Sequence, residues 1–151
     1  FGLMALPVII LFVPSAYFSV RLAARFGSTR IIALGTLITL SGSVGLFVAV
    51  LSGHTSVAAM LIASAILGWG NGQVIPNATA EAVNLFPKLA GTASASLGTA
   101  QMGMGAVASL LFGLMHDGTP TAMAMLMAGM ALAAFVSCGL IVAARRRPAA
   151  A

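Results

Sequence analysis

The sequence is poor in charged residues. Of its 151 residues, seven are Lys or Arg and two are Asp or Glu, so 6% are charged while 60% are hydrophobic. An ordinary soluble domain has about 25% charged residues. So few charges cannot cover the surface of a water-soluble fold, and we therefore expect lipid to surround most of the protein.

Residues that carry metal and catalytic chemistry are also scarce. The single cysteine, Cys138, excludes an internal disulfide and is expected to be a small packing residue. His54 and His116 fall in separate loops without a neighbouring Cys or carboxylate cluster, so we expect no metal site. The sequence shows no pattern of a nucleophile with a general base and a group that orients the base, which argues against an enzyme. We also expect no cofactor.

The long apolar runs predict an all-α integral membrane protein in which residues 1–151 form one transmembrane bundle. A membrane-spanning helix needs about 20 mostly apolar residues, because the hydrocarbon core is roughly 30 Å thick and a helix rises 1.5 Å per residue. The runs are too long and too continuously apolar for the strands of a membrane barrel. The five predicted spans are residues 1–20, 31–52, 56–83, 90–115 and 120–144.

The basic residues mark one end of these spans. All seven lie in residues 21–30, at Lys88 or in residues 145–147, and the two other loops between spans contain none. Lys and Arg accumulate in cytoplasmic loops, so we expect the C-terminus in the cytoplasm. The net charge of +5 thus reflects topology, and we expect no nucleic-acid partner.

The chain starts with Phe1 inside an apolar run, without the charged region or cleavage site of a signal peptide. We therefore expect it to be a fragment of a longer protein whose N-terminal helices are missing.

The third span carries two stripes with a four-residue spacing. Residues four apart lie on one face of a helix. Amides deep in a span are costly unless they face protein or water, so the polar stripe either lines a pathway or forms hydrogen bonds between helices. Both alternatives fit Gln73 and Asn77, whereas core packing is the favoured alternative for Trp69. The polar stripe is Trp69, Gln73, Asn77 and Glu81; the small-residue stripe, which allows close approach of another backbone, is Ser64, Gly68, Gly72, Pro76 and Ala80.

The fourth span also has small residues on two faces, which predict tight contact with two neighbouring helices. Its amide, Gln101, lies about 16 Å from the basic end, close to the middle of the bilayer. Gln101 either lines a cavity or makes a buried bond between helices. By contrast, the second and fifth spans contain no charged residue, Asn or Gln. We expect these two spans to be peripheral and largely in contact with lipid.

Glu81 is one of two acidic residues and ends the polar stripe near the basic loop of residues 21–30. A carboxylate at the membrane border favours an arginine partner, because paired hydrogen bonds offset the cost of desolvation. We expect Glu81 to pair with Arg25 or Arg21 and to latch the cytoplasmic side. The alternative is a solvated acid beside arginines that only set topology.

Residues 76–106, PNATAEAVNLFPKLAGTASASLGTAQMGMGA, resemble a signature of the bicyclomycin/chloramphenicol resistance (Bcr/CflA) drug:proton antiporters of the major facilitator superfamily. The loop RFGSTR, residues 25–30, is similar to a weakened copy of the superfamily loop G-x-x-x-D-R-x-G-R-R. Arg25 and Gly27 fit that loop, but Ala24 replaces its Asp.

The resemblance covers essentially the whole chain, as helices eight to twelve of a twelve-helix transporter, and hence part of its C-terminal half. It implies a multi-pass protein of the bacterial inner membrane that exports drugs or other small molecules by alternating access, driven by a proton gradient. It further implies that helices eight, ten and eleven face the cavity. The expected partners are the small-molecule substrate, protons, the lipid bilayer and the missing helices. The predicted cavity residues are Trp69, Gln73, Asn77, Gln101 and, on the first span, Tyr17.

Two alternatives remain open. A major facilitator carrier for sugars, amino acids or other metabolites would share the architecture. A membrane scaffold without transport would need no amides in the middle of the bilayer, so Gln73 and Gln101 discriminate against it.

Overall fold

The computed structural model describes residues 2–53, 56–85, 87–115 and 121–146. These residues form only helices, and five of the helices are long and apolar enough to cross a membrane. The predicted all-α architecture with five spans is thereby confirmed. The helices are α1 (Gly2–Phe26), α2 (Ser28–Leu51), α3 (Val57–Leu85), α4 (Ala90–Met115) and α5 (Thr121–Arg146), with a short 3-10 helix, η1 (Pro87–Leu89), before α4.

The predicted loop of residues 21–30 is almost entirely helical. α1 continues to Phe26 and α2 begins at Ser28, so only Gly27 separates them, at a φ of 88°. This positive φ is a conformation that glycine adopts without steric cost. The bilayer limits the length of an apolar run but not the length of a helix, and the Leu, Ala and Arg residues after residue 20 are good helix formers. Arg21 and Arg25 therefore lie on the last turns of α1.

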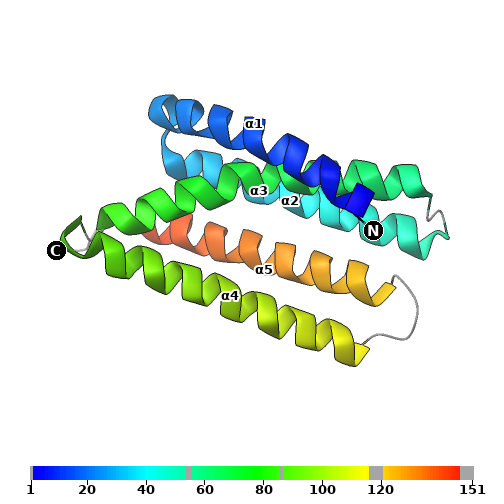
Figure 1. Cartoon of the computed structure of the whole chain (residues 1–151). Helices are drawn as coiled ribbons and strands as arrows, with labels where there is room; N and C mark the ends of the chain where they lie inside the picture. The colour runs from blue at the N-terminus through cyan, green and yellow to red at the C-terminus, as the bar shows by residue number, and fades with distance from the viewer. Residues whose placement is uncertain (1, 54–55, 86, 116–120, 147–151) are drawn as a thin grey trace.

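Glycines of α3 hold the first three helices together. A Cβ atom added at Gly68 would come within 2.6 Å of the backbone oxygen of Val8, and one at Gly72 within 2.6 Å of the backbone oxygen of Phe12. Gly70 faces the other way, against Gly35 and Thr39 of α2. α3 therefore packs closely against both α1 and α2 (Figure 1). Close approach along the small-residue stripe is confirmed at Gly68 and Gly72.

α2 is less peripheral than the sequence predicts. It contacts α1, α3 and α5, and it buries Ile31, Gly35, Thr36, Gly42 and Ser43. The buried hydroxyl groups of Thr36 and Ser43 bond to backbone carbonyls of α2 itself, at 2.9 Å each, so they can be buried without a partner on another helix. The prediction of a peripheral helix is therefore wrong for this side of α2. The other side carries the exposed residues Leu34, Leu37, Val44 and Val48, and its contact with lipid stays a prediction.

α5 packs on α2 through one narrow face. Ala124, Ala131 and Cys138 are buried and lie seven residues apart, which places them on one side of the helix. The neighbouring large residues, including Met125, are exposed. The burial of Cys138 agrees with its predicted packing role, and the contact of the remaining surface of α5 with lipid stays a prediction.

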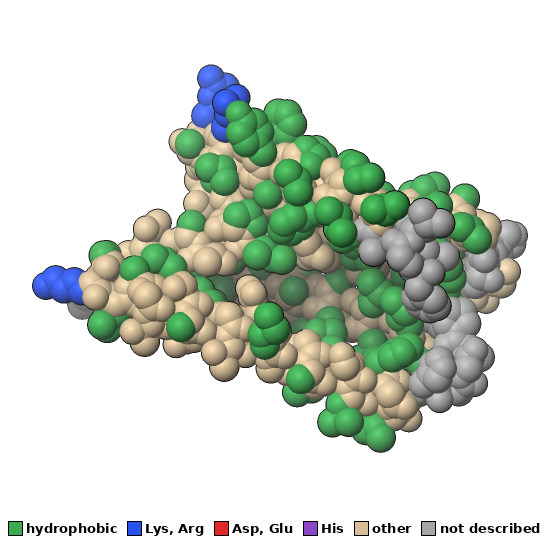
Figure 2. Space-filling model, viewed as in Figure 1, with side chains coloured by type: hydrophobic (Ala, Val, Ile, Leu, Met, Phe, Trp, Pro, Cys, Tyr) green, Lys and Arg blue, Asp and Glu red, His purple; other side chains and the backbone are tan. Residues whose placement is uncertain are grey.

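α4 lies at the edge of the array, beside α5 and the end of α3 (Figure 1). None of its residues is buried, and residues 98–107 are exposed on every face. Figure 2 shows a hollow between this helix and the rest of the described chain. The predicted tight contact with two neighbours is therefore wrong for the chain as described. Half-buried side chains occur only near the two ends of α4.

Candidate functional site

Polar groups form hydrogen bonds between α1 and α3, in a cluster that we call the polar seam: Ser15 and Ser19 on α1, and Asn77 with backbone carbonyls on α3. Ser15 donates a hydrogen bond to the backbone oxygen of Trp69 at 2.6 Å. The hydroxyl of Ser19 lies 2.8 Å from the backbone oxygen of Ala16 in its own helix and 3.4 Å from that of Gly72, and these two oxygens share its one proton. Both serines are buried. Pro76 has no N–H, so the carbonyl of Gly72 lacks its helical donor and is open to the hydroxyl of Ser19.

Asn77 belongs to the same seam. Its side-chain nitrogen donates to the hydroxyl of Ser19 at 3.1 Å and to the backbone oxygen of Gln73 at 2.7 Å, and the residue is only 4% exposed. This is the interhelical role that the sequence left open as an alternative. Lining of a substrate cavity by Asn77 stays a prediction, and its burial between α1 and α3 does not favour it.

Trp69 and Gln73 lie on the flank of α3 between α1 and α2, and both are half-buried. The Cβ atom of Gln73 would lie 3.0 Å from a Cβ added at Gly35 of α2. Gln73 therefore leaves the backbone close to α2, and no hydrogen bond of its amide to another described residue is present. The cavity roles of Trp69 and Gln73 stay predictions.

Asn71 lies on the opposite flank of α3, and its place in GWGNG, off the polar stripe, favours a structural role. It stands between Gly70, which faces α2, and Gly72, which faces α1. Successive residues are about 100° apart around a helix, so Asn71 points away from both contacts. It is half-buried, and its amide makes no hydrogen bond within the part of the chain that the structure describes. In GWGNG, residues 68–72, the glycines contact the neighbouring helices and the larger residues between them point away from these contacts.

Gln101 stands in the exposed middle section of α4. It is four residues after Leu97 and seven before Ala108, which are both half-buried, so all three lie on one face of the helix. This face is half-buried at Leu97 and at Ala108 and exposed between them. A hollow lies between α4 and the rest of the described chain (Figure 2). Met102, the next residue, is 80% exposed and points about 100° away.

The structure gives partners for two of the charged residues at the basic end. Glu81 accepts a hydrogen bond from the hydroxyl of Thr29 at 3.1 Å, which ties the end of α3 to the first turn of α2. The guanidinium of Arg21 lies over the ring of Tyr17, 4.7 Å from its centroid. Tyr17 is 57% exposed and lies on α1 away from the serines that face α3. The ion pair of Glu81 with Arg21 or Arg25 and the cavity role of Tyr17 stay predictions.

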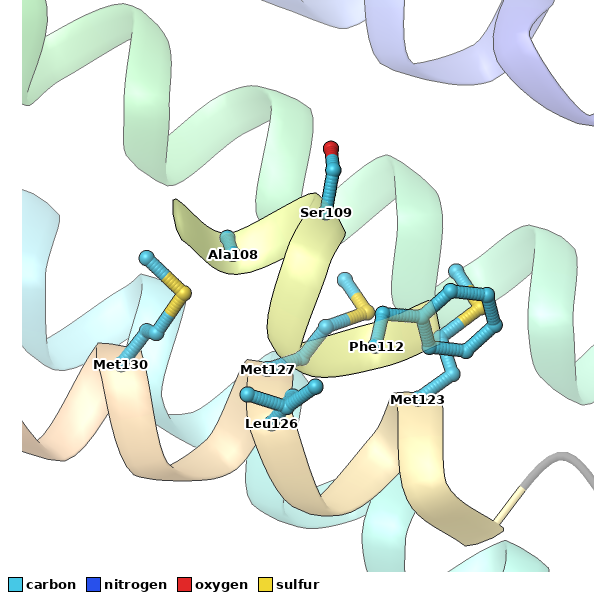
Figure 3. Close-up of a pocket in the computed structure, with 7 residues that line it drawn as sticks. All are labelled: Ala108, Ser109, Phe112, Met123, Leu126, Met127 and Met130. Carbon is cyan, nitrogen blue, oxygen red and sulfur yellow. The ribbon is translucent and has the colours of Figure 1, made fainter. Parts of the chain in front are cut away.

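An open crevice of about 250 Å³ lies between α4 and α5 (Figure 3). Its walls are apolar, and in Figure 3 the hydroxyl of Ser109 points away from the crevice. The sulfur atoms and the ring offer an adaptable surface, but no charged or amide group that would orient a ligand. The lining residues are Ala108, Ser109, Phe112, Met123, Leu126, Met127 and Met130.

No group of three His, Cys, Asp or Glu side chains that could hold a metal ion is present among the described residues. His54, His116 and Asp117 lie outside them.

A comparison of this chain with models of protein families, with curated proteins and with solved structures gives no match. The membrane character of the chain therefore stands on its five helices, whose length and composition indicate a multi-pass membrane protein.

Proposed function

We propose that this chain is the C-terminal portion, helices eight to twelve, of a proton-coupled efflux transporter of the major facilitator superfamily. The similarity of residues 76–106 to the Bcr/CflA drug:proton antiporters supports this proposal. In this arrangement α1, α3 and α4 border the substrate cavity of a protein of the bacterial inner membrane, and the C-terminus lies in the cytoplasm. Drugs or other small molecules leave by alternating access.

The observation that carries the proposal is the position of Gln101. It is an exposed amide at the middle of a membrane-length helix that borders the hollow, on the helix face that also carries the half-buried Leu97 and Ala108. An amide in contact with hydrocarbon would lose its hydrogen bonds to water, which costs several kcal/mol. A water-filled cavity in this hollow removes that cost and leaves the amide available to a substrate.

The proton-carrying residues of such a transporter belong to the rest of the protein. The sequence contains only two acids: Glu81, at the basic end of the third predicted span, and Asp117, in the loop before the fifth. We therefore propose that the chain contributes the substrate side of the cavity, and that helices preceding it contribute the groups that bind and release protons.

A carrier for a metabolite would use the same cavity, and the substrate class separates it from a drug exporter. A scaffold without transport would use its amides only to join helices. Asn77 fits that pattern through its bond to Ser19, but Gln101 does not, because it is exposed.

Replacement of Gln101 by leucine in the full-length protein tests this proposal. We expect Gln101→Leu to lower resistance to at least one exported compound by about fivefold, the effect of one lost hydrogen bond. Membrane expression should be unchanged. The matched control is Met102→Leu, which alters the adjacent exposed side chain and should leave resistance unchanged. Normal resistance of Gln101→Leu to every compound tested would contradict a cavity role.

A further inference from the structure

The outer face of α1 changes character along its length. Val13, Tyr17, Arg21 and Arg25 follow one another at four-residue spacing, and all four are exposed. Each step advances about 6 Å along the helix. Ser15 and Ser19 occupy the opposite face, where they bind α3. From the middle of α1 to its end, the exposed surface is therefore apolar, then aromatic, then basic. A membrane leaflet has the same order, with hydrocarbon, interface and headgroups.

Arg21 is held in place by Tyr17. The guanidinium carbon lies 4.7 Å from the centroid of the ring, at the distance of a cation–π contact. A guanidinium over a ring can still donate from its N–H groups, and its planar fork can bind two oxygens of a phosphate at once. Phe18, 6.0 Å from Tyr17 between ring centroids, supports the ring edge-on.

The surroundings of this face are strongly basic. Arg25, Arg30 and Lys88 are exposed at the same end of the helical array as Arg21, and basic side chains cap that end in Figure 2. Glu81 is the one acidic residue among those that the structure describes, and it accepts a hydrogen bond from Thr29. The charge at this end therefore complements an anion.

We propose that the α1 outer face, formed by Val13, Tyr17, Arg21 and Arg25, binds an anionic phospholipid. The two arginines bind the phosphate, Tyr17 positions Arg21, and an acyl chain lies along the apolar surface at Val13. Uncharged or zwitterionic lipids bind more weakly because the net negative charge is absent. This site gives Tyr17 a role at the lipid surface in place of the cavity role predicted from the sequence, and it does not depend on transport.

Mass spectrometry of intact protein–lipid complexes in nonionic detergent tests the site, with titration by phosphatidylglycerol or phosphatidylcholine. The double variant Arg21→Gln/Arg25→Gln should weaken binding of phosphatidylglycerol by about 25-fold, since one basic residue near a lipid surface contributes about fivefold. Binding of phosphatidylcholine should not change. The matched control Arg30→Gln/Lys88→Gln removes the same charge at the same end and should weaken binding less than about threefold.

Two further arms identify the chemistry. Tyr17→Leu keeps both charges but no longer positions Arg21, and it should weaken binding by about threefold, the typical strength of an exposed cation–π contact. Arg21→Lys/Arg25→Lys keeps the charge without the planar fork and should fall between the natural protein and the glutamine pair. Circular dichroism verifies that each variant is folded.

Excess inorganic phosphate should not displace the lipid, because free phosphate lacks the acyl chain. Three results would overturn the proposal: equal losses in the two double variants that lack charge, equal binding of the two lipids, or displacement by inorganic phosphate.

Discussion

Helices α3 and α4 carry the same kind of pattern but pack in opposite ways. Both have small residues at four-residue spacing and an amide within the span. In α3 the glycines touch α1 and α2 so closely that an added Cβ atom would collide with a backbone, and Asn77 binds a neighbouring helix. In α4 a Cβ added at any of its glycines, such as Gly98 or Gly103, would meet no atom within 4 Å, and Gln101 is exposed.

The difference separates two meanings of a small-residue stripe. Such a stripe allows a second backbone to approach, but it does not say which helix approaches or whether this chain supplies it. For α3 the hydrogen bonds show that the approaching helix is α1, because hydroxyl groups of α1 lie within hydrogen-bonding distance of backbone carbonyls of α3. α4 also has small residues, but in the described part of the chain the hydrogen bonds of its Ser94 and Thr99 side chains stay within the helix.

The largest expected contrast is between glycines of the two helices. Gly72→Ala places a methyl group against the backbone of Phe12, which cannot move without shifting α1, and should lower the free energy of unfolding by about 2 kcal/mol. Gly98→Ala has open space and should stabilise the helix by about 0.5 kcal/mol, because alanine loses less backbone entropy. Unfolding in mixed micelles, followed by circular dichroism, measures both. Equal losses would erase the distinction between the helices.

A smaller contrast concerns the amides. Asn77→Leu removes the bond to Ser19 and should cost about 1 kcal/mol, within the range measured for hydrogen bonds between membrane helices. Gln101→Leu should leave the stability of this chain unchanged, because no described residue binds that amide. A double-mutant cycle of Asn77→Leu with Ser19→Ala isolates the pair. A coupling energy near zero would show that Asn77 does not hold α1 to α3.

The number and type of helices were predictable because bilayer thickness imposes a length that an apolar run must reach. The stripe through Gly68 and Gly72 was predictable for a similar reason, since only small side chains allow backbones to meet. The end of α1 at Phe26 was not predictable, because bilayer thickness does not limit the length of a helix beyond the membrane. A prediction from apolar length alone therefore stopped α1 at residue 20.

The neighbours of each helix were harder to predict. In water, an apolar face marks the core, but in lipid both the buried and the exposed faces are apolar. The buried residues here are mostly small, such as Ala63, Ala124 and Ala131, whereas many large residues are exposed. Size therefore reports burial better than polarity in this chain. Polarity alone places α2 at the periphery, because its sequence contains no charged residue, Asn or Gln after Arg30.

The central claim is that the face of α4 at Gln101 borders water, while the adjacent face does not. Single cysteines at residues 101, 102 and 77, in a Cys138→Ser background, can be tested in intact membranes with a charged, membrane-impermeant maleimide, which reacts with the thiolate in water. We predict rapid labelling of Gln101→Cys and little labelling of Met102→Cys or Asn77→Cys. No labelling at residue 101, or equal labelling at residues 101 and 102, would contradict the account.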